Sequence, residues 1–231
     1  MPTFDPGSRS RLGWRDLGRF PGESLFDRIG RAVCAADVLP RKELYESWEV
    51  ARRARVFPRG VRVVDLAAGH GLIAYLMLLL DPSAPSALAV DARRPASAEP
   101  LAQALIQAWP RLAGKVEFIE RPIETVPLQQ TDLVVSAHAC GALTDRVLDR
   151  AIAVRAHVAV LPCCQSIKYL DHGGLDGWLE PTLAIDVVRA QRLAHAGYRV
   201  KTQQIRAEIT EKNRLLLGIP KEAAPEASDQ E

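Results

Sequence analysis

Carboxylates and small residues gather around one predicted turn of this chain. Residues 61–74 read VRVVDLAAGHGLIA, which is a β-branched run ending at Asp65, a stretch of small residues and then an apolar run. Gly69 and Gly71 have no Cβ, so a ligand can approach the main chain closely there. A turn of this kind at the carboxyl end of a strand is where an open α/β sheet binds an adenine-containing cofactor. The pattern therefore predicts a cofactor loop.

The glycine spacing alone fits more than one cofactor. Gly69, Gly71 and Ala74 satisfy G-x-G-x-x-A, the spacing of nicotinamide and flavin dinucleotide sites. Asp91 follows about 20 positions later, where an acid that binds a ribose is expected, and its two oxygens can accept both ribose hydroxyls. An NAD(P)-dependent oxidoreductase therefore stays open at this point.

Periodicity places the turn within an alternation of strands and helices. The expected strands are 61–66, 87–90, 116–119, 132–136, 157–161, 198–205 and 215–219, and the expected helices are 24–36, 41–55, 72–80, 98–109, 143–153 and 181–196. Five strands separated by helices require a parallel sheet with right-handed crossovers and helices on both faces. The last two strands have no helix between them, so they should pair as a hairpin at one edge.

Length and composition predict one α/β domain with additions. The chain has 231 residues, of which 48% are hydrophobic and 25% charged, enough to bury a full core. We expect an irregular N-terminal arm at 1–23, a helical cap at 24–59, the cofactor-binding domain at 60–220 and a disordered tail at 221–231.

Charge and cysteine usage limit the classes of partner. A formal net charge of +2 indicates no strong polyanion partner, although Arg52, Arg53, Arg55 and Arg59 form a local run that is either a solvated helix face or a nucleic-acid contact. No apolar run reaches the roughly 18 residues of a membrane span. The N-terminus lacks the basic-then-apolar order of a signal peptide, which predicts a cytoplasmic protein with four free cysteines.

The turn resembles motif I of the class I S-adenosylmethionine-dependent methyltransferases. Asp65 to Gly71 reads D-x-A-x-G-x-G, against acid-x-G-x-G-x-G in that family, with Ala67 at the first glycine. The predicted terminal hairpin is similar to that family's seventh strand, which lies antiparallel beside the fifth. The resemblance implies a Rossmann-like, seven-stranded α/β sheet and S-adenosylmethionine as cofactor. The implied cofactor-binding residues are Asp65, Ala67, Gly69, Gly71, Asp91, Ala92, Glu124 and Ser136.

Two later loops resemble a narrower group within this family. The first reads H-A-C-G-x-L-T-D at 138–145, and the second reads L-P-C-C at 161–164. Similar loops occur in the tRNA 2′-O-methyltransferases that act on the acceptor stem and in the methyltransferase-like domain of glutathione S-transferase C-terminal-domain-containing proteins; the resemblance covers about 42–220, including E-I-T-E-K-N-R-L-L-L-G. Gln165 and Ser166 stand where the tRNA enzymes have histidines, and their zinc-finger modules are missing. RNA is therefore favoured only slightly as the methyl acceptor, which the residues do not identify.

The same loops carry the candidate residues for catalysis and acceptor binding. A histidine has an unperturbed pKa near 6.5, which suits a base at neutral pH, so His138 is the candidate base; the alternative is a structural histidine that holds the loop. Cys140, Cys163 and Cys164 are expected to shape the acceptor pocket, and a zinc site with His138 is the less favoured reading, so no metal is expected. Asn213 is a candidate contact at the pocket rim.

A helix at 41–55 that crossed the cofactor cleft would bring Lys42 to the cofactor carboxylate. A non-catalytic module that binds S-adenosylmethionine or RNA also stays open.

Overall fold

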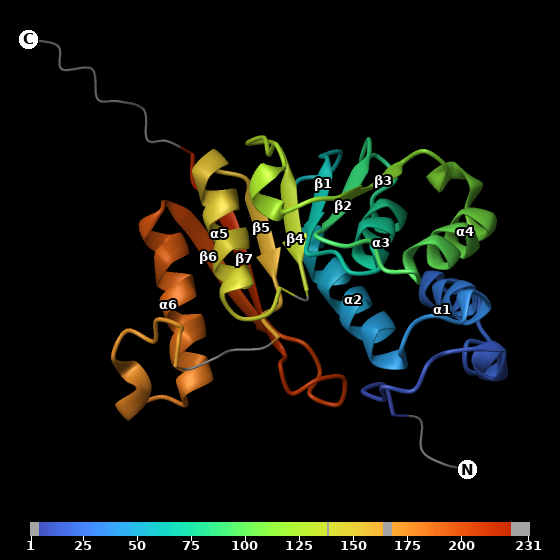
Figure 1. Cartoon of the computed structure of the whole chain (residues 1–231), viewed down its shortest axis with the longest axis horizontal. Coiled ribbons are helices and arrows are strands. Elements are labelled where there is room, and N and C mark those ends of the chain that lie inside the picture. The colour runs from blue at the N-terminus through green and yellow to red at the C-terminus, as the bar shows by residue number, and fades with distance from the viewer. Residues whose placement is uncertain (1–4, 138, 164–167, 223–231) are drawn as a thin grey trace, which may run out of the picture.

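The chain forms one mixed sheet of seven strands in the order β3-β2-β1-β4-β5-β7-β6 (Figure 1). This computed structural model describes residues 5–137, 139–163 and 168–222. The strands are β1 (Val63–Leu66), β2 (Ala87–Asp91), β3 (Val116–Glu120), β4 (Leu133–Ser136), β5 (His157–Val160), β6 (Tyr198–Gln204) and β7 (Arg214–Pro220). The first five are parallel, so the predicted Rossmann-like α/β sheet is confirmed.

The terminal hairpin lies where the sequence predicted it. β7 pairs antiparallel with both β5 and β6, and it therefore lies between them. Gly218 on β7 allows close packing here, because a Cβ at this position would lie 2.8 Å from Cγ1 of Val158. The antiparallel strand beside β5 confirms the predicted terminal hairpin and agrees with the seventh strand of the family that the turn resembles.

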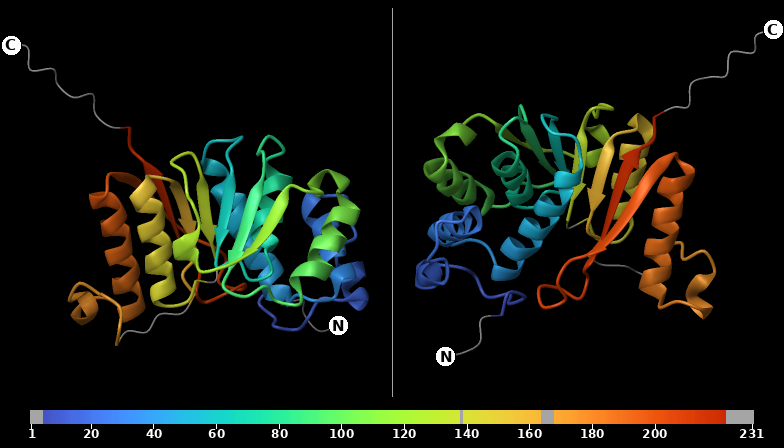
Figure 2. Two further views of the ribbon diagram at one scale, coloured as in Figure 1. Left: turned by 45° about the horizontal axis from the view of Figure 1, so that its top comes forward. Right: turned by 180° about the vertical axis from the view of Figure 1, so that it is seen from behind.

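Helices cover both faces of the sheet (Figure 2). One face carries α2 (Arg41–Arg53), α3 (Leu72–Leu80) and α4 (Ala98–Ala108), and the other carries α5 (Ala142–Val154) and α6 (Pro181–His195). Because side chains alternate along β1, Val63 packs in the core under α3 while Val64 packs in the core under α5. Asp65 follows the alternation of Val63 and faces the side of α2 and α3. None of the described helices has the length and apolar character needed to cross a membrane.

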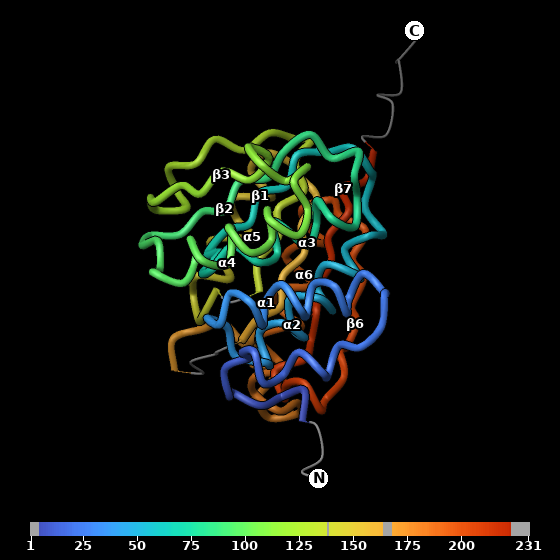
Figure 3. Tube along the Cα trace, turned by 90° about the vertical axis from the view of Figure 1, so that its right-hand side faces the viewer, coloured from blue at the N-terminus to red at the C-terminus, as the bar shows by residue number. Residues whose placement is uncertain are grey.

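The N-terminal segment packs against the helical cap. Helix α1 (Leu25–Ala36) lies beside α4, on the side that faces the viewer in Figure 3, and a short 3-10 helix (Trp14–Arg19) precedes it. Phe20 is fully buried against Gly30, where a Cβ would lie 2.3 Å from the ring. Arg41 donates a hydrogen bond to the carbonyl of Asp5 at 3.0 Å. The predicted tail lies outside the described residues from 223 onward, as do residues 1–4.

Candidate functional site

The turn after β1 depends on three residues in the left-handed region. Ala67, Gly69 and Gly71 have φ angles of +56°, +54° and +78°. At Gly71 a Cβ would lie 3.2 Å from the Cβ of Ala89, so glycine is required there by both conformation and space. Ala67 takes the place of the first glycine in the motif and adopts this conformation despite its Cβ, at a cost of about 1 kcal/mol.

Asp91 fixes the turn to the end of β2. Its Oδ2 accepts a hydrogen bond from the N–H of Gly69 at 2.9 Å, and its Oδ1 accepts one from the N–H of Arg93 at 3.3 Å. The carboxylate therefore joins the glycine turn to the loop after β2, and its predicted contact with ribose hydroxyls stays a prediction.

Most of the predicted cofactor residues line a single cleft of about 480 Å³. Ala67, Gly69, Asp91, Ala92 and Glu124 form its wall together with Cys140, which was predicted as an acceptor contact. Glu124 also accepts a hydrogen bond from Arg146 at 3.0 Å, and this bond lowers the pKa of Glu124. The cleft is in the size range of small-molecule sites, which are about 300–1,000 Å³.

Asp65 and Ser136 are buried polar residues near the carboxyl ends of the neighbouring strands β1 and β4. Asp65 is 1% exposed and neither carboxylate oxygen has a hydrogen-bond partner of good geometry. Burial raises its pKa well above the ordinary value and the charge of Asp91 adds to the rise, while the N–H of Ala74 opposes it. Ser136 is equally buried, and its Oγ has no hydrogen-bond partner. It lines neither this cleft nor a small hollow that Asp65 lines. An isolated buried carboxylate is unfavourable unless a cation or donor approaches it.

Sequence reasoning missed three residues that complete this end of the site. Glu43 and Ser47 of α2 line a small hollow with Asp65 and His70, which adjoins the larger cleft at Ala67. His70 lies 2.7 Å from Glu43 through Nε2 and contacts Ser97 through Nδ1, so it joins α2 to the start of α4. Glu43 could have been found from the sequence, because it lies on the helix that was expected to cross the cofactor cleft. Lys42, in contrast, pairs with Glu46 at 3.4 Å.

The loops after β4 and β5 converge through their cysteines. The Sγ atoms of Cys140 and Cys163 lie 2.9 Å apart, which is longer than the roughly 2.05 Å of a disulfide. His138 and Cys164 lie outside the described residues. Among the residues that the structure does describe, no group of three or more His, Cys, Asp or Glu side chains is arranged to hold a metal ion.

Asn213 and the basic run have structural contacts of their own. The side-chain amide of Asn213 donates to the carbonyl of Ile205 at 3.2 Å and thereby closes the loop between β6 and β7. It lines none of the cavities described here, so the predicted rim contact stays a prediction. In the basic run, Arg52 and Arg53 both pair with Glu49, and Arg59 pairs with Asp81.

Comparison with known proteins identifies a family. Residues 49–169, more than half of the chain, match the model of a family described as a methyltransferase domain. No protein of curated function matches the chain in sequence. A protein from Nostoc punctiforme regarded as an O-methyltransferase has a similar fold, with a TM-score of 0.50 and 17% identity over 89% of this chain and 67% of that one. An uncharacterized protein from Listeria monocytogenes has a TM-score of 0.50 and 11% identity over 75% and 67% of the two chains.

Proposed function

The chain belongs to the methyltransferase domain family and is an S-adenosylmethionine-dependent methyltransferase, and we propose that the cleft at the carboxyl ends of β1 and β2 holds the cofactor. One observation carries the proposal. Five of the cofactor residues predicted from the sequence line one cleft, and the hollow that adjoins it contains a buried carboxylate whose oxygens have no hydrogen-bond partner of good geometry.

The residues present fit the two ends of this cofactor. Asp91 offers a carboxylate for ribose hydroxyls, and it is already held in place by the N–H of Gly69. Asp65 offers a buried carboxylate, whose oxygens have no hydrogen-bond partner of good geometry, to the ammonium group of the methionine part. Gly69 leaves the cleft open, because a Cβ there would meet no atom within 4 Å. Each glycine of the motif therefore has its own physical reason, since Gly71 is required by conformation and space and Gly69 leaves room for the ligand.

The acceptor side is formed by the loops after β4 and β5. S-adenosylmethionine supplies an electrophilic methyl group on a sulfonium sulfur, so the protein mainly has to position the nucleophile. We assign His138, in the first of these loops, the removal of the proton from an acceptor hydroxyl. RNA is the acceptor that the loop resemblance slightly favours, although the net charge of +2 indicates no strong polyanion partner.

Calorimetric titration tests the cofactor assignment. We expect S-adenosylmethionine and S-adenosylhomocysteine to bind the wild-type protein and NADH to give no signal. Asp91→Ala should weaken binding at least about tenfold, because hydrogen bonds to a charged group are lost. The matched control is Glu120→Ala, which removes a carboxylate at the corresponding end of β3 that does not line the cleft. Binding of NADH without binding of S-adenosylmethionine would overturn the proposal.

A further inference from the structure

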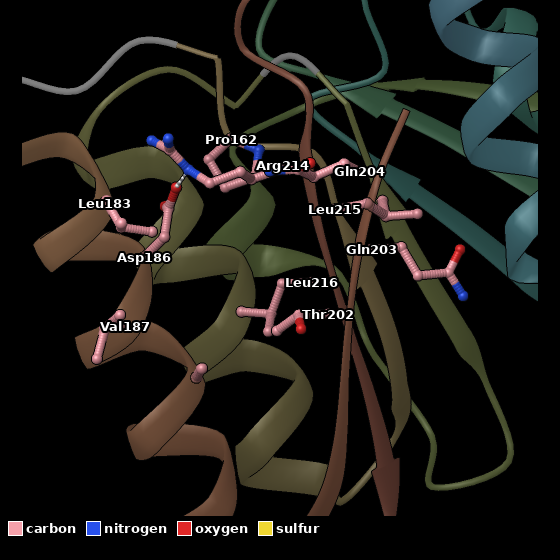
Figure 4. Close-up of a pocket in the computed structure, with 11 residues that line it drawn as sticks. Pro162, Leu183, Asp186, Val187, Thr202, Gln203, Gln204, Arg214, Leu215 and Leu216 are labelled. Atoms are coloured by element: carbon pink, nitrogen blue, oxygen red, sulfur yellow. Dashed lines mark hydrogen bonds and ion pairs between the residues drawn. The ribbon is translucent and has the colours of Figure 1, made fainter. Parts of the chain in front are cut away.

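A second pocket, of about 410 Å³, lies between α6 and the β6–β7 hairpin (Figure 4). Leu183 and Val187 of α6 form one wall, and Leu216 of β7 forms the opposite wall. Leu216 pairs with Thr202 across the hairpin, so both side chains face α6. The pocket is thus a slot between a helix and a sheet, with apolar groups on its two broad sides.

Polar groups gather at one end of this slot. Arg214 donates from Nε to Asp186 at 2.7 Å and from Nη2 to Thr182 at 2.7 Å. Gln204 pairs with Arg214 in the hairpin and lines the same end. Arg214 and Arg189 both pair with Asp186, and Arg189 also pairs with Asp145, so two carboxylates offset the two guanidinium charges beside the slot, which therefore does not favour a phosphate or a carboxylate. It favours an uncharged group that forms hydrogen bonds along its edge.

The slot adjoins the proposed site of methyl transfer. Pro162 lines the slot and directly precedes Cys163, whose Sγ lies 2.9 Å from the Sγ of Cys140. Cys140 in turn lines the cofactor cleft. The slot and the cleft are thus linked through Pro162, Cys163 and Cys140.

We propose that this slot binds an uncharged heterocyclic ring of the methyl acceptor, of the kind that nucleosides carry; this rests on the proposed function. Apolar side chains above and below suit the faces of a flat ring. Amide, carboxylate and guanidinium groups at one end are the side chains that hydrogen-bond to the edges of nucleobases. A free nucleoside and a base within RNA share this chemistry.

Methyl NMR titration with nucleosides and RNA tests the inference. The probes are adenosine, guanosine, cytidine, uridine and a single-stranded RNA of mixed sequence, each added without S-adenosylmethionine. We expect at least one probe to shift the methyl signals of Leu183, Val187 and Leu216. A response to nucleosides would show that a free nucleoside is enough to occupy the slot. A response to RNA alone would show that the ring has to be part of the polymer.

Two variants that introduce a leucine on α6 distinguish binding in the slot from binding elsewhere on the surface. Ala190→Leu adds volume at a residue that lines the slot and should weaken binding of the active probe at least tenfold. Ala194→Leu makes the same change one turn later, at an exposed position outside the slot, and should leave binding within twofold. Equal binding by both variants, or no response from any probe, overturns the inference. Because S-adenosylmethionine binding is measured separately, its loss counts against the proposed function alone.

Discussion

Arg189 donates to both carboxylate oxygens of Asp145, from Nε at 3.1 Å and from Nη2 at 2.8 Å. The same Nη2 donates to the carbonyl of Gly141 at 3.1 Å, and Arg189 is only 1% exposed. Asp145 and Gly141 belong to the H-A-C-G-x-L-T-D stretch after β4. A side chain of α6 thus holds the loop that carries Cys140 and His138.

Replacement of this arginine should loosen the loop as well as lower stability. We expect Arg189→Met to reduce the free energy of unfolding by about 3 kcal/mol, because Asp145 and Asp186 lose a buried partner. Hydrogen exchange at residues 139–143 should rise, and the affinity for S-adenosylhomocysteine should fall because Cys140 and Leu143 line the proposed cofactor cleft.

Arg192→Met is the control for the arginine prediction. Arg192 also pairs with Asp145, at 2.8 Å, but it is 35% exposed and makes no bond to Gly141. Its replacement should change stability by less than about 1 kcal/mol and leave exchange at 139–143 unaltered. Equal exchange in both variants would show that Arg189 does not position the loop.

The two glycines of the turn should respond differently to alanine. Gly71→Ala places a Cβ 3.2 Å from Ala89 at a φ of +78°, so the free energy of unfolding should fall by about 2 kcal/mol. Gly69→Ala meets no protein atom, so it should cost about 1 kcal/mol and mainly reduce cofactor affinity. Urea unfolding and calorimetry measure the two effects. The same loss of affinity and stability in both variants would contradict this division.

Asp65 should make the stability of the cofactor-free protein depend on pH. Its pKa in the folded state lies above the unfolded value, so the folded protein binds more protons and stability falls as the pH rises from about 4. Asp65→Asn removes the charge that burial disfavours. We expect the variant to be more stable than the wild type at neutral pH, to lose this pH dependence and to bind S-adenosylmethionine more weakly. Urea unfolding across this pH range is the measurement, and identical pH profiles would refute the assignment.

His138→Ala tests the proposed base. Loss of a positioned base should lower the rate of S-adenosylhomocysteine formation about 100-fold or more, with cofactor affinity preserved. The assay uses methyl-labelled cofactor with fractionated RNA, and the labelled fraction also identifies the acceptor. Unchanged turnover in the variant would show that His138 does not act as the base.

The sequence predicted the fold more fully than the site. Helix and strand positions follow from local periodicity, so the six α-helices and seven strands of the described residues lie within a few residues of their predicted bounds. The contacts of Asn213 with Ile205 and of His70 with Glu43 depend on segments that only the folded chain brings together. The same is true of Arg189, which is 44 positions from Asp145 and carried no motif of its own.

Hydrogen–deuterium exchange with saturating S-adenosylhomocysteine tests the assignment of the cofactor cleft, because it locates the bound cofactor along the chain. We expect protection at the turn 66–72 and at 91–93, where the N–H of Gly69 and the carboxylate of Asp91 meet. We expect no change at 198–204 of β6. Protection absent from the turn, or confined to α6 and the terminal hairpin, would contradict the assignment of this cleft to the cofactor.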